Sequence, residues 1–256
     1  MKEGKITTEK KDLVFAFVLF PGMTLLDIIG PATLLQNQGF TIEYVWHDKQ
    51  PISTEINCVT LTPTTIFYEL DAVDILCITG SHNPFPALND TKMLKWIHKV
   101  GQNAKYITRV CNGSMFLAAV NLLDNYRSSV HWSCNEFLAK LGTTVSNERV
   151  TIDRNRISGG GVTADIDFGL RILSIIKSET DAKVMQLLTQ YDPQPPFQSG
   201  NPATAEPEIV NIACNNIKTS FETDTPDYLE ILERAIERKK DFINNQIIYS
   251  IMLNII

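Results

Sequence analysis

The chain has 256 residues, of which 44% are hydrophobic and 20% charged, and its 29 acidic and 23 basic residues give a formal charge of −6. A chain of this length can bury roughly three quarters of its unfolded surface, so we expect one main domain. The acidic balance offers no electrostatic surface for gripping phosphates, which excludes nucleic acid as an expected partner.

The cysteines and the N-terminus indicate the compartment. The five cysteines are an odd number without close pairing, which favours reduced thiols; they lie at positions 58, 77, 111, 134 and 214. Residues 1–11 are charged and lack the apolar stretch of a secretion signal. No apolar run approaches the about 20 residues that a membrane-spanning helix requires. We therefore expect a soluble, cytoplasmic protein without a membrane partner.

Strands and helices alternate in the first half of the chain. Residues 13–20 (LVFAFVLF) are an apolar run closed by Pro21-Gly22, which is typical of a strand buried on both faces of a parallel sheet. Residues 24–38 predict a helix with Thr24 as a candidate N-cap and with an interruption at Gly30-Pro31. Further patterns predict a helix at 90–101 and strands at 41–46, 58–62, 73–79 and 105–110.

The second half begins with a segment, 112–123, that is apolar on nearly all faces and predicts a buried helix. Residues 149–158 predict a hairpin that turns at residues 153–155, and helices follow at 162–176 and 181–191. This alternation predicts an α/β fold with a mostly parallel central sheet, helices on both faces, and ligand sites at the carboxyl ends of the strands.

Cys111 stands out among the cysteines because it directly follows a predicted strand and precedes Asn112-Gly113-Ser114 and the buried helix. This context suggests a nucleophile elbow, in which a sharp strand-to-helix turn presents the reactive side chain. The positive end of the helix dipole would lower the pKa of such a thiol. The alternative is that Cys111 is a small buried apolar residue like most cysteines.

Asp27 lies among four large aliphatic residues in the sequence Leu25-Leu26-Asp27-Ile28-Ile29. A buried carboxylate is costly unless a partner compensates it. Because Asp27 follows the first strand, it could face the same carboxyl edge of the sheet as Cys111. A structural salt bridge or a helix cap is the alternative.

His131 lies about one helix beyond Cys111, and a cysteine with a nearby histidine invites a dyad interpretation. A packed histidine at a helix start is favoured over the dyad. His131 and Cys134 are also three residues apart, but two ligands without a second pair are a weak metal signal, so no metal site is expected.

Five motifs together resemble the ThiJ/PfpI superfamily of class I glutamine amidotransferase-like proteins. They are FPGMTLLDIIGP at 20–31, VCNGS at 110–114, His131-Trp132, GGGVTADIDF at 159–168 and QYDPQPPF at 190–197, and the last two narrow the resemblance to the isonitrile hydratase branch. The similarity runs from about residue 13 to about residue 221. It implies a flavodoxin-like, amidotransferase-like fold.

The resemblance also implies a mechanism for a small-molecule substrate. Cys111 would be the nucleophile, Asp27 would act on the substrate or on water, and backbone N–H groups near Gly80-Ser81 and Asn112-Gly113 would stabilise an anion. Hydratases similar to this chain convert an isonitrile to an N-substituted formamide without a metal or an organic cofactor, and the resemblance implies a homodimer. Thiolate attack on the electrophilic isonitrile carbon would give a thioimidate that water then opens.

The chain departs from the hydratase pattern at two places. Asn112 follows the cysteine where such hydratases usually have Thr, and Thr79-Gly80-Ser81 stands where they have Pro-Gly-Gly. The first change replaces a hydroxyl that would reach the substrate. The second is expected to stiffen the anion pocket, because Ser resists the positive φ that Gly accepts.

The predicted organisation is a charged extension at 1–12, a ThiJ/PfpI-like domain at 13–221 and a C-terminal addition at 222–256. Residues 227–242 have the spacing of an amphipathic helix. The last ten residues, 247–256 (IIYSIMLNII), are almost wholly apolar yet half as long as a membrane span. Packing on the domain or on a partner subunit is the favoured interpretation; a membrane-surface role and a disordered tail are the alternatives.

Two functions of different class fit these patterns. One is the hydratase, or a related enzyme acting on a small carbon–nitrogen compound. The other is a sensing module, because similar domains form the ligand-sensing half of AraC-type regulators. Such regulators need a basic pair of helix-turn-helix units, about 100 residues long, after the domain. Only 35 residues follow Phe221, so a DNA-binding regulator is disfavoured. A sensor that acts through a protein partner, or a redox or carbonyl-stress protein that uses Cys111, stays open.

Overall fold

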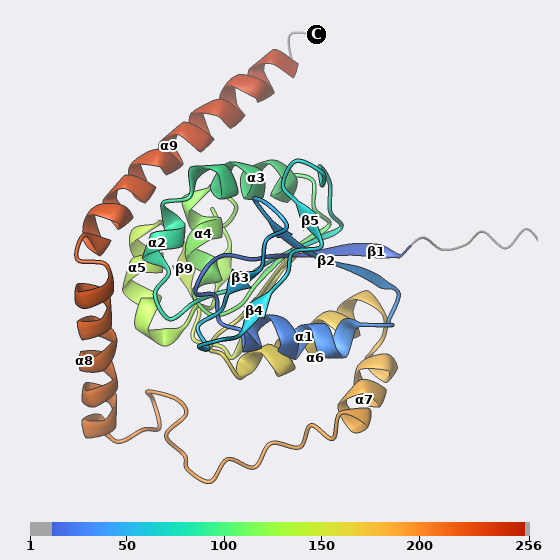
Figure 1. The fold of residues 1–256 in the computed structure, drawn as a ribbon, viewed down its shortest axis with the longest axis vertical. Helices are drawn as coiled ribbons and strands as arrows, with labels where there is room; N and C mark the ends of the chain where they lie inside the picture. Colours follow the sequence, from blue (N-terminus) through green and yellow to red (C-terminus); the bar gives the residue numbers. More distant parts are fainter. Residues whose placement is uncertain (1–11, 254–256) are drawn as a thin grey trace, which may run out of the picture.

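A computed structural model describes the backbone of residues 12–253 and the side chains of residues 12–244 (Figure 1). The strands of this part are β1 Leu13–Val18, β2 Phe40–Trp46, β3 Ile52–Ser53, β4 Thr60–Leu61, β5 Thr65–Ile66, β6 Ile75–Ile78, β7 Tyr106–Arg109, β8 Arg127–Ser128, β9 Thr144–Val145, β10 Val150–Asp153 and β11 Arg156–Gly159. The α-helices are α1 Leu26–Leu35, α2 Phe85–Leu88, α3 Thr91–Gly101, α4 Gly113–Ala119, α5 Asn135–Lys140, α6 Ala164–Ile176, α7 Glu179–Leu188, α8 Pro207–Asp224 and α9 Tyr228–Leu253, and a 3-10 helix spans Trp132–Cys134.

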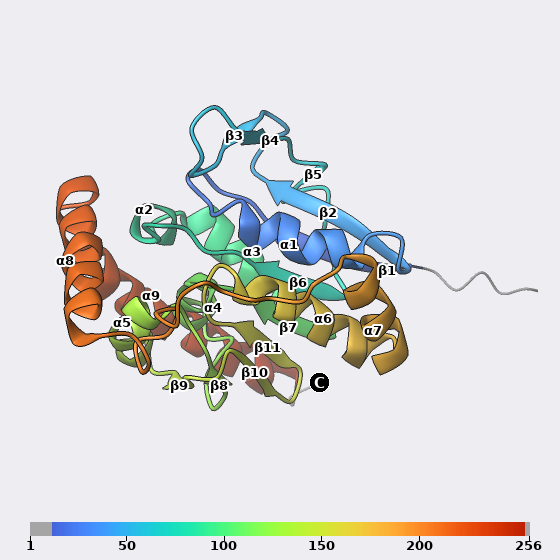
Figure 2. The same cartoon turned by 90° about the horizontal axis from the view of Figure 1, so that it is seen from below.

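The main sheet has the strand order β10-β11-β7-β6-β1-β2-β5. All neighbours in it are parallel except the hairpin β10–β11, so the predicted mostly parallel sheet is confirmed. Figures 1 and 2 show α1, α6 and α7 on one face and α3 and α4 on the other. Helices on both faces explain why β1 reads as continuously apolar: Phe15 to Val18 have no exposed surface.

The register of the central strands decides where the functional residues meet. Val18 at the end of β1 pairs with Ile78 at the end of β6, and Ile78 pairs with Arg109 at the end of β7. The segments that follow these three strands therefore start at one edge of the sheet. Thr24, after β1, donates its backbone N–H to Gly80 O at 2.9 Å and ties two of these segments together.

The predicted interruption of the first helix at Gly30-Pro31 is wrong, because α1 continues to Leu35 with Pro31 inside it. Packing explains the difference. α1 lies directly against α6, and a Cβ on Gly169 of α6 would come within 3.1 Å of Pro31 Cα. Burial against a neighbouring helix outweighs one lost backbone hydrogen bond and the low helix propensity of these two residues.

Other boundaries differ from the predicted ones. The strand predicted at 58–62 is reduced to Thr60–Leu61, because the exposed Cys58 has a φ of 66° and forms a turn. The helix α8 was not predicted, since only Phe221 of its 18 residues is buried and its polar surface gives no apolar period. The expected domain boundary at residue 221 falls inside α8.

The predicted amphipathic helix at 227–242 is confirmed as part of α9. Ile231, Leu232 and Ala235 are at most 2% exposed, and Lys239 donates to Leu141 O at 2.7 Å, so α9 packs on the body of the molecule. No helix in the described part of the chain is long and apolar enough to cross a membrane. Residues 1–11 of the extension predicted at 1–12 lie outside the described residues, as do the side chains of the apolar stretch 247–256.

Candidate active site

Cys111 lies between β7 and α4, two residues after Arg109 and two before Gly113. Its φ is 53°, a left-handed value that costs energy for a residue with a Cβ. The residue is only 3% exposed. The sharp change of direction from strand to helix is therefore made at Cys111 itself.

Two glycines allow the segments around Cys111 to approach each other. A Cβ on Gly80 would lie 2.6 Å from Cys111 Cβ, and a Cβ on Gly113 would lie 2.4 Å from the carbonyl oxygen of Ile78. Both distances are far below van der Waals contact. Neither glycine has a positive φ, so space and not backbone conformation requires them.

Gly113→Ala is expected to lower the free energy of unfolding by about 3 kcal/mol, because the new methyl group meets the backbone of β6, which cannot rotate away. Chemical denaturation measures the change. Gly160→Ala is the matched control, since the nearest atom to its Cβ would be Arg149 O at 3.6 Å. Equal stability of the two variants would contradict the close approach.

Asp27 is carried on the first turn of α1 and has no exposed surface. Its Oδ2 accepts a hydrogen bond from Gly80 N at 2.7 Å, whereas no N–H or O–H group donates to Oδ1. Burial raises the pKa of Asp27 to about 6, against the lowering effect of the neighbouring Asp165 side chain and of the Gly80 N–H. A carboxyl group with this pKa can gain or lose a proton near neutral pH.

Asp165 is a second buried carboxyl group at this site. It is not among the site residues predicted from the sequence. It lies near the start of α6 and is fully buried, and its side chain interacts with that of Asp27. Burial, followed by the nearby charge of Asp27, raises the pKa of Asp165 well above its usual value. The signal in the sequence is the same as for Asp27, because Asp165 is an acid next to apolar residues in GGGVTADIDF.

The thiol of Cys111 does not have the lowered pKa that the sequence predicted. Burial raises its pKa well above the usual value, and the charges of Asp27 and Asp165 raise it further, while the Asn112 N–H lowers it by a smaller amount. The short helix α4 does not outweigh the desolvation and the two neighbouring acids. The resting site therefore holds a neutral thiol beside a group that can accept its proton.

Two of the N–H groups expected to stabilise an anion, those of Gly80 and Ser81, are engaged by side chains, and the N–H of Gly113 donates to Val110 O at 2.9 Å. Gly80 N donates to Asp27, and Ser81 N donates to Asn112 Oδ1 at 3.0 Å. Asn112 Nδ2 in return donates to Ser81 O at 2.7 Å. Ser81 is not among the residues with positive φ, so the Ser found in place of Gly adds no strain there. The distinctive effect comes from the first departure, because the Asn112 amide binds both the backbone N–H and the backbone C=O of Ser81.

His131 precedes the 3-10 helix, as a packed histidine at a helix start would. Its backbone N donates to Cys111 O at 3.1 Å, and its ring Nδ1 pairs with Ser133 Oγ at 2.8 Å. Burial lowers the pKa of His131, which favours the neutral ring. His131 thus supports the Cys111 backbone, and its ring is directed to Ser133.

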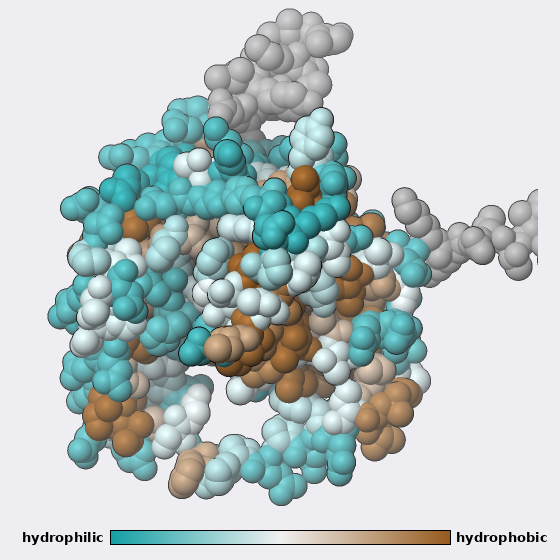
Figure 3. Space-filling model, in the orientation of Figure 1, coloured by the Kyte–Doolittle hydropathy of each residue, from teal (hydrophilic) through white to brown (hydrophobic). Residues whose placement is uncertain are grey.

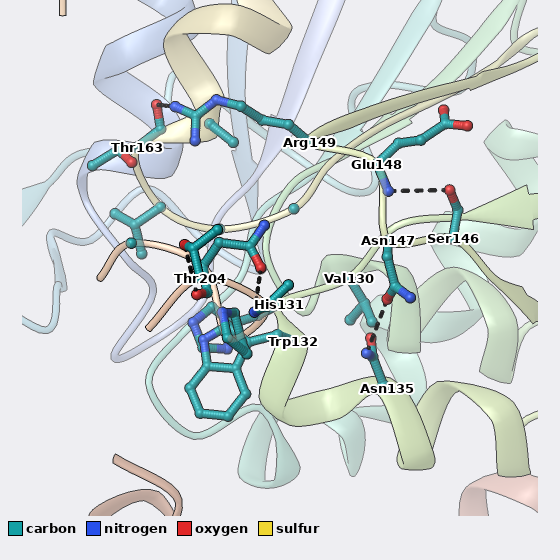
Figure 4. A pocket seen from close by; sticks show the side chains of 18 of the residues that line it. Val130, His131, Trp132, Asn135, Ser146, Asn147, Glu148, Arg149, Thr163 and Thr204 are labelled. Atoms are coloured by element: carbon teal, nitrogen blue, oxygen red, sulfur yellow. Dashed lines mark hydrogen bonds between the residues drawn. The ribbon is translucent and has the colours of Figure 1, made fainter. Parts of the chain in front are cut away.

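A cavity of about 840 Å³ lies between the body of the molecule and residues 195–204, and neither Cys111 nor Asp27 is among the residues that line it. Figure 3 shows the opening between this segment and the body. Of the residues predicted from the sequence, His131 lines the cavity; Figure 4 shows it beside Trp132 and Thr204, across from Arg149. Arg149 donates to Thr163 O at 3.1 Å and forms an ion pair with Asp167.

The described residues contain no group of three or more His, Cys, Asp or Glu side chains that could hold a metal ion. The remaining cysteines differ from Cys111 in their settings. Cys77 is buried in β6 and Cys134 in the 3-10 helix, whereas Cys58 and Cys214 are exposed. Cys111 is the cysteine at the strand edge where Asp27 and Gly80 meet.

Comparison with known proteins gives a consistent family. The model of the DJ-1/PfpI family matches residues 14–175. Isonitrile hydratase from Pseudomonas putida is 35% identical over 224 residues, which cover 87% of this chain and 96% of that protein. The HTH-type transcriptional regulator CdhR from Pseudomonas aeruginosa is 26% identical over 168 residues, which cover 62% of this chain and 49% of the regulator.

Solved structures agree with this result. The crystal structure of a ThiJ/PfpI family protein from Pseudomonas syringae has a TM-score of 0.78 and 31% sequence identity, over 93% of this chain and 97% of that one. Oxidized DJ-1 from Toxoplasma gondii has a TM-score of 0.62 at 12% identity, over 71% of this chain and 100% of that chain, which shows a shared fold. The chain therefore belongs to the DJ-1/PfpI family.

Proposed function

We propose that this protein is a cysteine-dependent hydratase that adds water to an isonitrile and gives an N-substituted formamide. The observation that carries the proposal is the placement of Cys111 and the buried carboxyl Asp27 around Gly80 at one edge of the sheet. The similarity to an isonitrile hydratase over 87% of the chain supports the choice of substrate.

The first half of the proposed reaction adds the thiol across the isonitrile carbon. Because the resting thiol is neutral, Asp27 takes its proton as the sulfur attacks. A bond forms between Cys111 Sγ and the terminal carbon, and Asp27 returns the proton to that carbon. The product is a thioimidate, which has one carbon–nitrogen double bond and is bound covalently to the enzyme.

The second half opens the thioimidate with water. Asp27, ionised again, removes a proton from water while the oxygen bonds to the same carbon, and the nitrogen becomes an N–H group. The tetrahedral intermediate then loses the thiolate, which recovers its proton, and the N-substituted formamide leaves. Isonitrile and water enter and formamide leaves, so the cycle requires no further reactant.

The test is direct. Purified protein is incubated with alkyl and cyclohexyl isonitriles, and the formamide is measured by chromatography and mass spectrometry. Product formation that saturates with substrate supports the hydratase. If the whole panel yields no formamide, the assignment fails, and a binding role related to that of the similar transcriptional regulators becomes the better hypothesis.

The redox alternative is the less favoured one. Cysteines that sense oxidants are exposed and have a low thiol pKa, since the thiolate is the reacting form. Cys111 is 3% exposed, and its surroundings raise its pKa. Slow labelling of Cys111 by iodoacetamide at neutral pH would agree with the base-assisted mechanism, and rapid labelling would favour the sensor.

Asn112→Thr is expected to raise the turnover of isonitriles by about 10-fold. The threonine side chain cannot hold Ser81 through both its N–H and its C=O as the Asn112 amide does, so the Ser81 N–H becomes free to stabilise charge that develops on the substrate. Steady-state kinetics measure the change in kcat. A lower kcat in a variant of unchanged stability would mean that the amide contributes directly to the site.

The homodimer that the resemblance implies stays a prediction. Large apolar side chains are exposed at the end of α7 and in the segment that follows it. Leu187, Leu188 and Phe197 are 81%, 73% and 77% exposed. Such side chains suit contact with a second copy.

A further inference from the structure

The carboxyl groups of Asp27 and Asp165 form a buried pair that the proposed reaction uses only in part. Neither residue has exposed surface, and Arg and Lys form no ion pair with either of them in the described part of the chain. No N–H or O–H group donates to Asp27 Oδ1 or to either oxygen of Asp165. Two ionised carboxylates in this place would be strongly unfavourable.

One proton shared within the pair resolves this conflict, and the backbone indicates which residue holds it. Gly80 N donates to Asp27 Oδ2 at 2.7 Å and stabilises the negative charge on Asp27. Asp165 has no such donor, because no backbone N–H group reaches either of its buried oxygens. The proton therefore belongs to Asp165, and its O–H can donate to the free Oδ1 of Asp27.

We propose that Asp165 is a positioning residue, a neutral acid at pH 7 to 8 whose O–H holds the ionised Asp27 carboxylate in place for proton transfer with Cys111. The position of Asp165 suits this role, because α6 packs on α1 and Asp165 Cβ is 3.7 Å from the Cβ position of Gly30, one helical turn after Asp27. With Gly80 on one oxygen and Asp165 on the other, both oxygens of Asp27 are fixed.

The charged and titratable groups around the pair are consistent with one negative charge. Besides the two acids themselves, four groups interact electrostatically with Asp27 or Asp165. They are Glu55, Cys77, Cys111 and Arg149. The two thiols are neutral, and both have a raised pKa. Glu55 raises the pKa of Asp27 and Arg149 lowers that of Asp165, but both effects are smaller than that of burial.

Infrared spectroscopy tests the protonation state without any substrate. At pH 8 every exposed carboxyl group is ionised, so the wild-type protein should show one C=O band from a buried protonated carboxyl group. Asp165→Asn should abolish this band, while Asp27→Asn and the exposed control Glu179→Gln should keep it. Absence of the band in the wild type, or its persistence in Asp165→Asn, would overturn the proposal.

Kinetics then test the positioning role, which rests on the proposed function. Asp165→Asn keeps a donor for Asp27, so the acidic limb of the kcat/KM profile should stay near that of the wild type. Asp165→Leu removes the donor, and the limb should move upward by about one pH unit or more. Equal loss of activity in both folded variants would refute the role as donor.

The two failures are distinguishable. If the wild type makes no formamide but the infrared band behaves as expected, the hydratase assignment fails and the Asp165–Asp27 pair stands. If Asp165→Leu does not fold, the comparison of the infrared band between the wild type and Asp165→Asn still decides the proposal.

Discussion

Cys111→Ala should reduce formamide formation by about 10⁴-fold or more, because no other group can form the covalent bond to the isonitrile carbon. The fold should survive, since alanine retains the Cβ that already packs against Gly80. Formamide release measures the first effect and thermal unfolding the second.

Other cysteines supply the controls for this variant. Cys214 is exposed on α8, and Cys134 is buried in the 3-10 helix, so Cys214→Ala and Cys134→Ala should both retain turnover. If a folded Cys111→Ala variant keeps activity within about 10-fold of the wild type, the proposed covalent mechanism through Cys111 is wrong.

Asp27→Asn should reduce kcat by about 100-fold to 10,000-fold, since the amide keeps the shape of the side chain but cannot exchange protons. In the wild type kcat/KM should fall as the pH drops below about 6, because the protonated form of Asp27 cannot accept the thiol proton. A pH profile of both proteins measures these effects. Residual activity of Asp27→Asn with an unshifted limb near pH 6 would assign that limb to another group.

The same carboxyl group makes stability depend on pH. The pKa of Asp27 is about 6 in the folded protein, against the ordinary value of 3.8, so the folded state binds more protons and the free energy of unfolding falls as the pH rises between these values. The difference corresponds to about 3 kcal/mol. Urea unfolding at pH 4.5 and 7.5 should show about 2 kcal/mol of this difference, and Asp27→Asn should remove it.

Much of the fold follows from local patterns in the sequence. The apolar run at 13–20 and the alternation of strands and helices are sufficient to predict a parallel sheet, and Cys111 was placed at the strand-to-helix junction where the structure has it. The continuity of α1 could not be predicted, because it depends on Gly169 from a helix more than 130 residues away in sequence.

The candidate site was harder to predict because its electrostatics depend on burial and on distant neighbours. A helix N-terminus beside Cys111 suggests a lowered thiol pKa, but two acids from α1 and α6 and the loss of solvent reverse the direction. Likewise, the bond between Asn112 and Ser81 joins residues 31 positions apart, and no local pattern indicates that the amide would occupy the Ser81 N–H.

The segment that carries Gly80 and Ser81 is anchored to the far end of the chain. Phe85, which is four residues after Ser81, packs with Phe137, Phe221 and Tyr228, and Asn83 Nδ2 donates to Thr225 Oγ1 at 2.9 Å. Helices α8 and α9 therefore help to hold the segment that carries Gly80 and Ser81 in place. An affinity tag or a binding protein that displaces these two helices would transmit its effect to Gly80, so a tag used in assays of the proposed activity should not be placed next to them.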